Sequence, residues 1–345
     1  MGAAVKCDWS PGVPNLRIPT YQTMGVRGLG GFIRWKLPHV RKTLDWRKHT
    51  GKRWGVDCSC LLYRARGVSL SPVSVIASLI VRLRRSNIEP VFVFDGRTPT
   101  VKGDVVDQRR VVRQAAQREM AEIKVDLAEG GLTEIQKAEM DRRHADLQKK
   151  APVVTSGDKD DVKTFLHAAG VLFVTAAGEA DDVLAYLCRD GTLQGVVSTD
   201  MDMLARGVPY LIVPETNDAS VLTEICLGDV LSGIGLQYTQ FVDACMLMGS
   251  DYSGKGWRSM EPKAAIEMAR SGVQWAEIDI SGSVCSVMER GVALLLGSGI
   301  QWEDIIGERQ RAKWLLGQPT REPDTIATLA KSHGWPVDWV PVLGG

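Results

Sequence analysis

Short apolar runs alternate with segments of helical spacing through the middle of the chain. Four runs have the length and composition of buried strands: 54–57, 91–96, 171–174 and 195–197. Between them, residues 72–86 and 179–189 carry apolar side chains at helical intervals. Strands that alternate with helices are typical of a mainly parallel sheet covered by helices on its faces. The pattern therefore predicts an α/β fold.

Residues 102–150 follow a different pattern, with 11 Lys or Arg, 10 Asp or Glu and few bulky apolar side chains. Gly130-Gly131 divides the segment into two expected helices. The second begins with Thr133 and Gln136 at the spacing of a capping box. A helical pair this polar cannot lie in a core, so we expect it to project as an arch, a lid or an arm for a partner.

The two ends of the chain have simpler patterns. Residues 1–23 contain three prolines and no periodic apolar pattern, which predicts a disordered extension without the apolar core of a signal peptide. From about 227 to 345 the chain is expected to be mostly helical. A short echo, 271–278 and 298–305, suggests a repeated unit to which no function is assigned.

Composition narrows the class of protein. The 345 residues are 44% apolar and 24% charged, which suits a chain with a real core. No run approaches the ~18 apolar residues of a spanning helix, so we expect no membrane partner. Seven scattered cysteines without a C-x-x-C pair favour a reducing, intracellular compartment and disfavour structural zinc. The expected location is the nucleus in a eukaryote and otherwise the cytoplasm, with an organelle or a virus left open.

The net charge of +1 hides an uneven distribution. Residues 24–54 hold nine Lys or Arg against one acid, Asp45. Such a basic segment suits a protein that binds a polyanion. A solvated basic face explains the charge equally well at this point.

Acidic residues mark the strand ends and helix starts. They are Asp57, Asp95, Glu179, Asp181, Asp200, Asp202 and Asp251. The carboxyl ends of parallel strands meet at one edge of a sheet, where ligands bind. Carboxylates brought close together need a compensating charge, which Mg²⁺ supplies, and a pair of such ions can cleave phosphodiesters. Any one of these acids alone is better explained as a turn or N-cap residue, so the prediction rests on the set.

The ordered motifs resemble those of the flap endonuclease family, the structure-specific 5′ nucleases that include 5′–3′ exonucleases and Rad2/XPG-type repair nucleases. The resemblance extends from residue 24 to about 270. It is carried by the motifs at 24–29, 55–59, 91–97, 179–182, 199–202 and 247–252.

The resemblance implies a PIN-like nuclease fold, a projecting helical arch, and a helical C-terminal part with a helix-turn-helix-type DNA-binding hairpin. The implied division is an extension (1–23), an N-terminal nuclease region (24–101), the arch (102–150), an internal nuclease region (151–252) and a helical C-terminal region (253–345).

The resemblance also implies roles for individual residues. Asp95, Glu179 and Asp181 would bind one Mg²⁺, with Asp57 acting through water. Asp200, Asp202 and Asp251 would bind a second, and Mn²⁺ would be able to substitute. Lys102 and Arg109 would act as electrostatic clamps on the scissile phosphate. Nucleic-acid contacts are expected from Gly25, Tyr63, Lys255, Arg258 and Lys263.

Two departures from the family pattern affect the expected partners. Ser259, Met260 and Glu261 stand where the family's substrate-gripping hairpin has glycines, so duplex binding is expected to be altered. No sliding-clamp motif is found, and a monomer is expected. The leading hypothesis is a Mg²⁺-dependent 5′ nuclease for branched or 5′-ended DNA in replication or repair. An RNA-cleaving member of the family and a non-catalytic nucleic-acid-binding protein are the alternatives.

Overall fold

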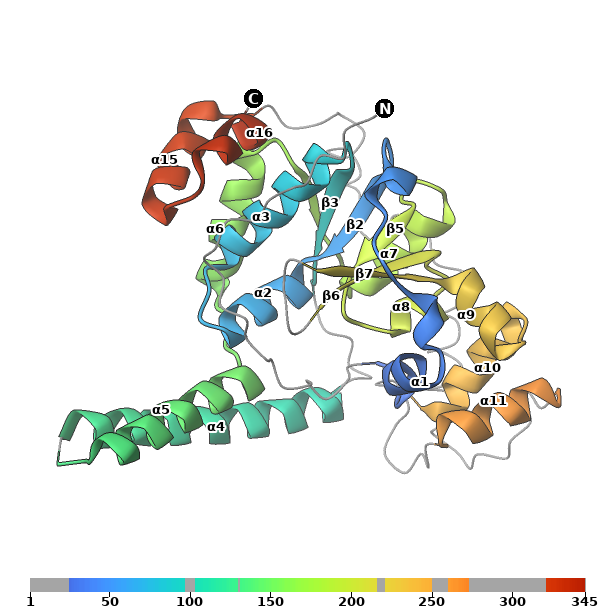
Figure 1. The fold of residues 1–345 in the computed structure, drawn as a ribbon, viewed down its shortest axis with the longest axis horizontal. Helices are drawn as coiled ribbons and strands as arrows, with labels where there is room; N and C mark the ends of the chain where they lie inside the picture. Colours follow the sequence, from blue (N-terminus) through green and yellow to red (C-terminus); the bar gives the residue numbers. More distant parts are fainter. Residues whose placement is uncertain are drawn as a thin grey trace, which may run out of the picture.

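The computed structural model describes residues 25–96, 103–129, 131–215, 221–249, 260–272 and 321–344, with side chains of the second range described from 110 on. Its centre is a seven-stranded sheet in the order β1-β7-β6-β5-β2-β3-β4 (Figure 1). The strands are β1 (Arg41–Thr43), β2 (Arg53–Asp57), β3 (Glu89–Phe94), β4 (Leu172–Thr175), β5 (Gly195–Val197), β6 (Tyr210–Pro214) and β7 (Leu222–Cys226).

The sheet is mainly parallel, as predicted. β2 pairs in parallel with both β3 and β5, β3 pairs with β4, and β5 pairs with β6. β7 runs antiparallel to its neighbours β6 and β1. The four predicted strands correspond to β2, β3, β4 and β5, whereas the sequence pattern did not predict β1, β6 or β7.

Helices cover both faces of the sheet, because its central strands are apolar on both sides. Along β3, Val91 and Val93 pack into one core, and Phe92 and Phe94 pack into the other. The first core is covered by α1 (Leu29–Lys36), α7 (Ala180–Arg189), α8 (Asp202–Ala205), α9 (Leu227–Ile234), α10 (Tyr238–Met248) and α11 (Pro262–Arg270). The second is covered by α2 (Cys58–Gly67), α3 (Pro72–Arg85), α6 (Ser156–Ala168), α15 (Pro323–His333) and α16 (Val340–Gly344).

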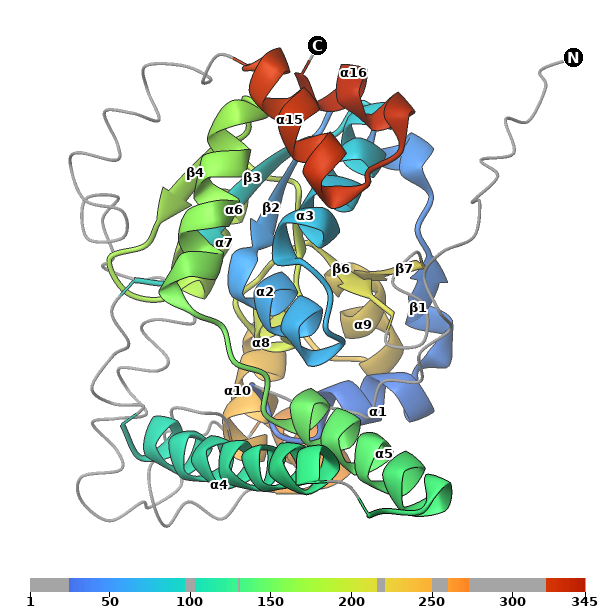
Figure 2. The ribbon, with the colours of Figure 1, turned by 90° about the vertical axis from the view of Figure 1, so that its left-hand side faces the viewer.

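The last described segment docks on α3 and α6 (Figure 2). The Trp335 ring lies edge-on to Phe165, with centroids 5.4 Å apart, and its Nε1 donates to Ser74 Oγ at 2.9 Å. The described parts of the predicted helical C-terminal region are indeed helical. The predicted extension 1–23 lies outside the described residues, as does the repeat apart from residues 271–272.

The predicted arch is confirmed. α4 (Gly103–Glu129) and α5 (Glu134–Lys150) form an antiparallel pair that projects from the body (Figures 1 and 2). Thr133 and Gln136 form the predicted capping box at the start of α5. Arg143 of α5 pairs with Glu119 of α4 at 2.7 Å, and a small apolar cluster joins the helices. No helix in the described part of the chain is long and apolar enough to cross a membrane.

Candidate active site

Acidic side chains meet where the parallel strands end. Asp57 is the last residue of β2, and Asp95 directly follows β3. β5, the other neighbour of β2, leads into Asp200 and into Asp202 at the start of α8. Because β2, β3 and β5 run in the same direction, these carboxylates share one edge of the sheet, as the sequence predicted.

Asp57 is the buried centre of this group. It is 8% exposed and accepts hydrogen bonds from Ser198 Oγ at 2.9 Å and from the Cys60 amide at 3.2 Å. Burial, followed by the negative charges of Asp181 and Asp95, raises the pKa of Asp57 to about 8. Asp57 is therefore repelled by both Asp181 and Asp95, and a cation near it would relieve this repulsion.

Asp95 joins the end of β3 to the start of α7. Its side chain accepts hydrogen bonds from the Ser59 hydroxyl and, at 2.9 Å, from the Ala180 amide. Gly96 makes this approach possible, since a Cβ there would overlap the backbone carbonyl of Ala176. These contacts place Asp95 beside the start of α7. Glu179 is the N-cap of this helix, and Asp181 lies in its first turn.

The second acidic pair is tied to the first described residues of the chain. Asp200 accepts from the Asp202 amide at 2.9 Å, and Asp202 accepts from the Val26 amide. Gly25 has φ +99°, and a Cβ on it would overlap both carboxylates. This position therefore requires glycine for two reasons: its backbone conformation and its proximity to the acids.

A buried arginine, which the sequence analysis missed, stands among these acids. The side chain of Arg206 is completely buried, forms an ion pair with Asp182 and lies 4.0 Å from Glu179. It is a fixed positive charge inside an acidic site. Its one signal in the sequence is that it is a lone charged residue within the apolar segment 203–208.

The carboxylate set fits a hard divalent cation in its chemistry, because every predicted ligand supplies oxygen. Within the described residues, however, no group of three or more His, Cys, Asp or Glu side chains is arranged closely enough to hold an ion. Asp251, a predicted ligand, lies outside the described residues. The described carboxylates thus converge without forming a complete coordination shell.

The predicted nucleic-acid contacts are partly described. Tyr63 lies on α2, and the guanidinium of Arg113 from α4 stands 5.5 Å from its ring centroid. Lys263 is 83% exposed on α11. Arg109 is in α4 without a described side chain, whereas Lys102, Lys255 and Arg258 lie outside the described residues.

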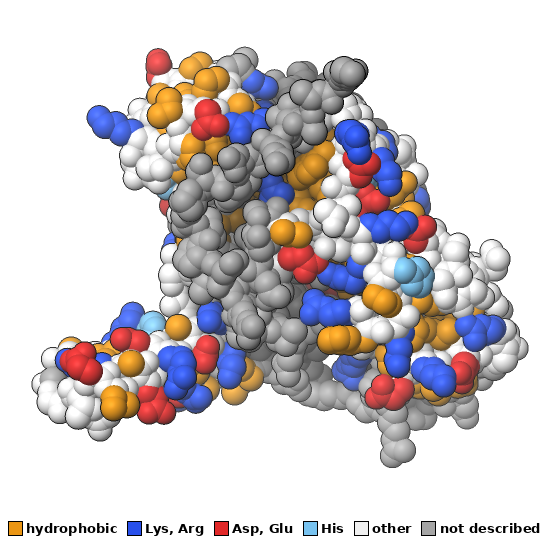
Figure 3. All heavy atoms as spheres, viewed as in Figure 1, with side chains coloured by type: hydrophobic (Ala, Val, Ile, Leu, Met, Phe, Trp, Pro, Cys, Tyr) orange, Lys and Arg blue, Asp and Glu red, His pale blue; other side chains and the backbone are white. Residues whose placement is uncertain are grey.

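The basic segment 24–54 is less uniform in space than in sequence. Arg41 forms an ion pair with Glu215, and Lys42 forms one with Asp229 at 2.6 Å. Blue and red side chains are interspersed over this side of the molecule (Figure 3). The charge of the segment is therefore partly neutralised by acids that lie far away in the sequence.

The fold and the site define a class: an α/β protein with a helical arch and an acidic site at the carboxyl edge of a parallel sheet. Two family models match, the XPG N-terminal domain over residues 24–116 and the XPG I-region over residues 170–251. The chain belongs to the flap endonuclease/XPG family.

Individual relatives agree with this assignment. The chain is 28% identical over 247 residues to flap endonuclease 1 of Lodderomyces elongisporus, covering 66% of this chain and 61% of the relative. It is 30% identical over 258 residues to flap endonuclease 1 of Cryptosporidium muris, covering 67% of this chain and 52% of the relative. The matches thus span between half and about three fifths of these relatives.

Solved structures confirm the fold. The flap endonuclease-1 from Methanococcus jannaschii has a TM-score of 0.59 at 21% identity, covering 88% of this chain and 95% of its own. The catalytic core of Rad2 in complex with DNA substrate also has a TM-score of 0.59, at 18% identity, covering 92% and 99%.

Proposed function

We propose that this chain is a divalent-metal-dependent, structure-specific 5′ nuclease that hydrolyses phosphodiester bonds in branched or 5′-ended DNA. The observation that carries the proposal is the convergence of acids around Asp57, whose pKa is raised to about 8 by burial and by Asp181 and Asp95. In a chain of this family, such a crowded acidic centre, which Arg206 only partly offsets, is best explained as a cation site. The relatives named flap endonuclease 1 support the choice of substrate.

Two Mg²⁺ ions would be held by the acids of the carboxyl edge. Asp95, Glu179 and Asp181 would hold one, with Asp57 acting through water, and Asp200, Asp202 and Asp251 would hold the other. When bound, the ions activate water and stabilise the leaving oxygen, and Mn²⁺ would serve in their place.

The chain's own residues orient these acids. Ser198 and the Cys60 amide fix the Asp57 carboxylate, and the Ala180 amide fixes Asp95. Fixed hydrogen bonds to ligands keep the donor oxygens in place before an ion arrives. Arg206 offsets part of the negative charge through Asp182 and Glu179, which lowers the repulsion that the fold must tolerate without metal.

Basic residues and Tyr63 would hold the nucleic acid. Lys102 and Arg109 would clamp the scissile phosphate, and Tyr63 would stack on a base. Arg113 occupies one face of the Tyr63 ring, so a stacking base would have to displace it or use the other face. Lys255, Arg258 and Lys263 would contact the backbone as point charges.

An RNA substrate is the second candidate, because the start of α11 is poorly suited to holding duplex phosphates. The Met260 amide donates to the Leu247 carbonyl at 3.0 Å and so does not face a phosphate. Glu261 is exposed at the N-cap of α11, where its carboxylate would repel an anion. A non-catalytic nucleic-acid-binding role is the remaining alternative.

The test is a cleavage assay with Mg²⁺ on end-labelled substrates: a 5′ DNA flap, a nicked duplex, single-stranded DNA and single-stranded RNA. Asp200→Ala is the inactive comparison, and Asp141→Ala, which changes an exposed acid on the arch, is the matched control. We expect flap cleavage that survives Asp141→Ala and is lost with Asp200→Ala.

Other outcomes separate the alternatives. Cleavage of RNA alone would replace the DNA proposal with the RNA-cleaving one. Binding to the panel without any metal-dependent cleavage would leave only the non-catalytic role.

A further inference from the structure

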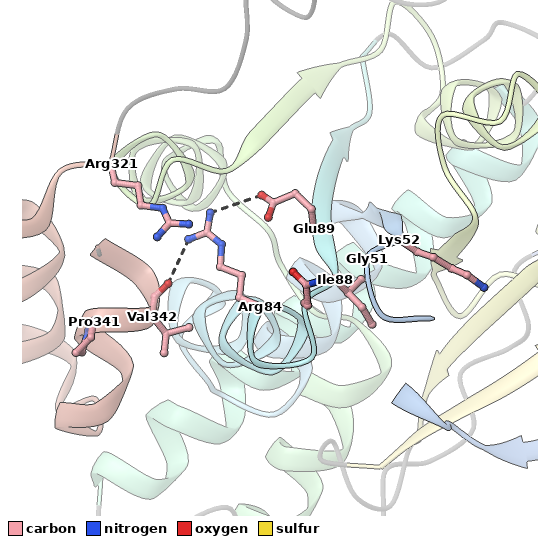
Figure 4. Close-up of a pocket in the computed structure, with 9 residues that line it drawn as sticks. Gly51, Lys52, Arg84, Ile88, Glu89, Arg321, Pro341 and Val342 are labelled. Carbon is pink, nitrogen blue, oxygen red and sulfur yellow. Dashed lines mark hydrogen bonds and ion pairs between the residues drawn. The ribbon is translucent and has the colours of Figure 1, made fainter. Parts of the chain in front are cut away.

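A cavity of about 360 Å³ opens at the opposite edge of the sheet, where β2 and β3 begin. Residues far apart in the sequence line it: Arg84 at the end of α3, Ile88 and Glu89 at the start of β3, Arg321, and Pro341 and Val342 of α16 (Figure 4). Asp57 and Asp95 lie five to six strand residues away, roughly 17–20 Å at the rise of a strand. The cavity is therefore separate from the acidic edge.

Arg84 is held rigidly in the wall of this cavity. Its side chain is only 7% exposed. Its guanidinium donates to the backbone carbonyls of Ala169 at 2.9 Å and Gly170 at 3.1 Å, and more weakly to those of Val342 and Leu343. Its buried Nε has no hydrogen-bond partner among the described residues. Neutral carbonyls orient the guanidinium but leave its charge in place.

The cavity carries more positive than negative charge. Arg321 places a second guanidinium beside that of Arg84 (Figure 4). Among the described residues that line the cavity, Glu89 is the one with a carboxylate, 3.6 Å from Arg84 Nη2. Lys52 adds little, because its side chain points away and its ammonium lies 5.5 Å from the centre of the Tyr210 ring. Burial and the charge of Arg321 lower the pKa of Arg84, while Glu89 opposes the shift.

Two guanidinium groups side by side, with one carboxylate near Arg84 alone, are suited to an added anion. Arginine binds phosphate and carboxylate oxygens through paired N–H donors, and such charge-assisted bonds are the stronger ones. Arg321 would supply such a pair, whereas Arg84, whose Nη atoms already donate to carbonyls, would contribute its charge. The volume lies at the lower end of small-molecule sites and exceeds that of a bare phosphate ion. Ile88, Pro341 and Val342 supply an apolar wall for an organic part.

We propose that this cavity binds a phosphate monoester, with the phosphate at Arg84 and Arg321 and the organic part against Ile88, Pro341 and Val342. The ligand would join α3 to α16 and thereby hold the C-terminal segment on the body. The same chemistry is present in a free nucleotide and in the 5′-phosphorylated end of a strand.

The test is calorimetric titration of the full chain in EDTA, which removes the divalent ions that would anchor a phosphate at the acidic edge. The probes are adenosine 5′-monophosphate, inorganic phosphate, adenosine and a 5′-phosphorylated oligonucleotide. We expect the monophosphate to bind more tightly than inorganic phosphate and adenosine not to bind.

Variants separate a built site from general charge. Arg321→Gln, at an exposed position, removes a charge-assisted contact worth at least about 1.5 kcal/mol, so we expect the dissociation constant to rise about tenfold or more. Arg321→Lys is expected to lose less affinity for the monophosphate. Lys331→Gln, on the neighbouring α15, is expected to leave the affinity unchanged. Circular dichroism of each variant checks that it is folded.

The outcomes decide both the site and the source of the ligand. Monophosphate binding that is unchanged by Arg321→Gln, or matched by adenosine, would overturn the proposal. Arg321-dependent binding of the monophosphate alone would identify a free small molecule. The same dependence for the oligonucleotide would identify a strand end.

Discussion

The two edges of the central sheet carry opposite chemistry. At the carboxyl edge, Asp57, Asp95, Asp200 and Asp202 follow parallel strands, and burial with mutual repulsion raises the pKa of Asp57 to about 8. At the amino edge, Arg84 and Arg321 stand together with a single carboxylate in the cavity lining. A parallel sheet thus separates two charged sites by the length of its strands. Residues at one edge can therefore be substituted without changing residues at the other.

Removing the buried guanidinium of Arg206 from the acidic edge should have the largest effect on stability. Arg206→Met would leave Asp182 and Glu179 without their buried partner, and breaking a buried pair in this way costs about 3–5 kcal/mol. Urea denaturation in EDTA measures the loss. Adding Asp182→Asn should recover part of it, and a loss below about 1 kcal/mol would show that Arg206 does not balance the site.

Substituting Gly25 should disturb the same edge through shape rather than charge. An alanine in the left-handed region costs roughly 1–2 kcal/mol, and at Gly25 its Cβ would also displace Asp200 and Asp202. Gly51→Ala is the matched control, because Gly51 has φ +77° and no atom of the described residues lies within 4 Å of a Cβ placed there. We expect Gly25→Ala to abolish metal-dependent cleavage and Gly51→Ala to keep it. Equal activities would contradict the described contact.

Asp57 should make the metal-free protein less stable as the pH rises. Its folded pKa of about 8 exceeds the ordinary value of 3.8, so the folded state holds the proton more tightly. The stabilisation is complete below about pH 4 and is lost as the pH rises through about 8. Unfolding in EDTA between pH 5 and 8.5 measures this slope, which Asp57→Asn should flatten. An unchanged slope in the variant would assign it to other groups.

The smallest effect is expected at the opposite edge. Trp335→Phe keeps an aromatic ring beside Phe165 but loses the hydrogen bond to Ser74, worth about 1 kcal/mol. Because the docked C-terminal segment is remote from the acids, cleavage by the folded variant should match that of the unchanged chain. A large loss of cleavage at unchanged folding would show that the two edges are coupled.

The acidic edge was predictable because Asp57, Asp95 and Asp200 stand at or just after the ends of strands that short apolar runs reveal. The arch was predictable because residues 102–150 are too polar for a core. β1 could not be predicted, because Arg41, Lys42 and Thr43 form a polar edge strand. Its pairing with β7 does not produce an apolar pattern in its own sequence. The pattern likewise missed β6 and β7.

Features that depend on contacts between distant segments were missed. In the sequence, Arg206 cannot be distinguished from an ordinary arginine, because only the fold brings Asp182 of α7 close to it. Arg84 and Arg321 meet only because the C-terminal segment returns to α3. The sequence left open whether the basic segment 24–54 binds a polyanion or is a solvated basic face, and it did not show that Glu215 and Asp229 pair with Arg41 and Lys42. Sequence order shows which charges exist, and the fold decides which of them remain uncompensated.

The central claim is that the acids of the carboxyl edge act together as a cation site. The most direct test is the thermal midpoint of the full chain with and without Mg²⁺ at pH 8, for the unchanged protein, Asp200→Ala and Asp141→Ala. A ligand that binds only the folded state raises the midpoint. We expect Mg²⁺ to stabilise the unchanged chain and Asp141→Ala, but to stabilise Asp200→Ala far less. Equal stabilisation of all three would contradict the claim.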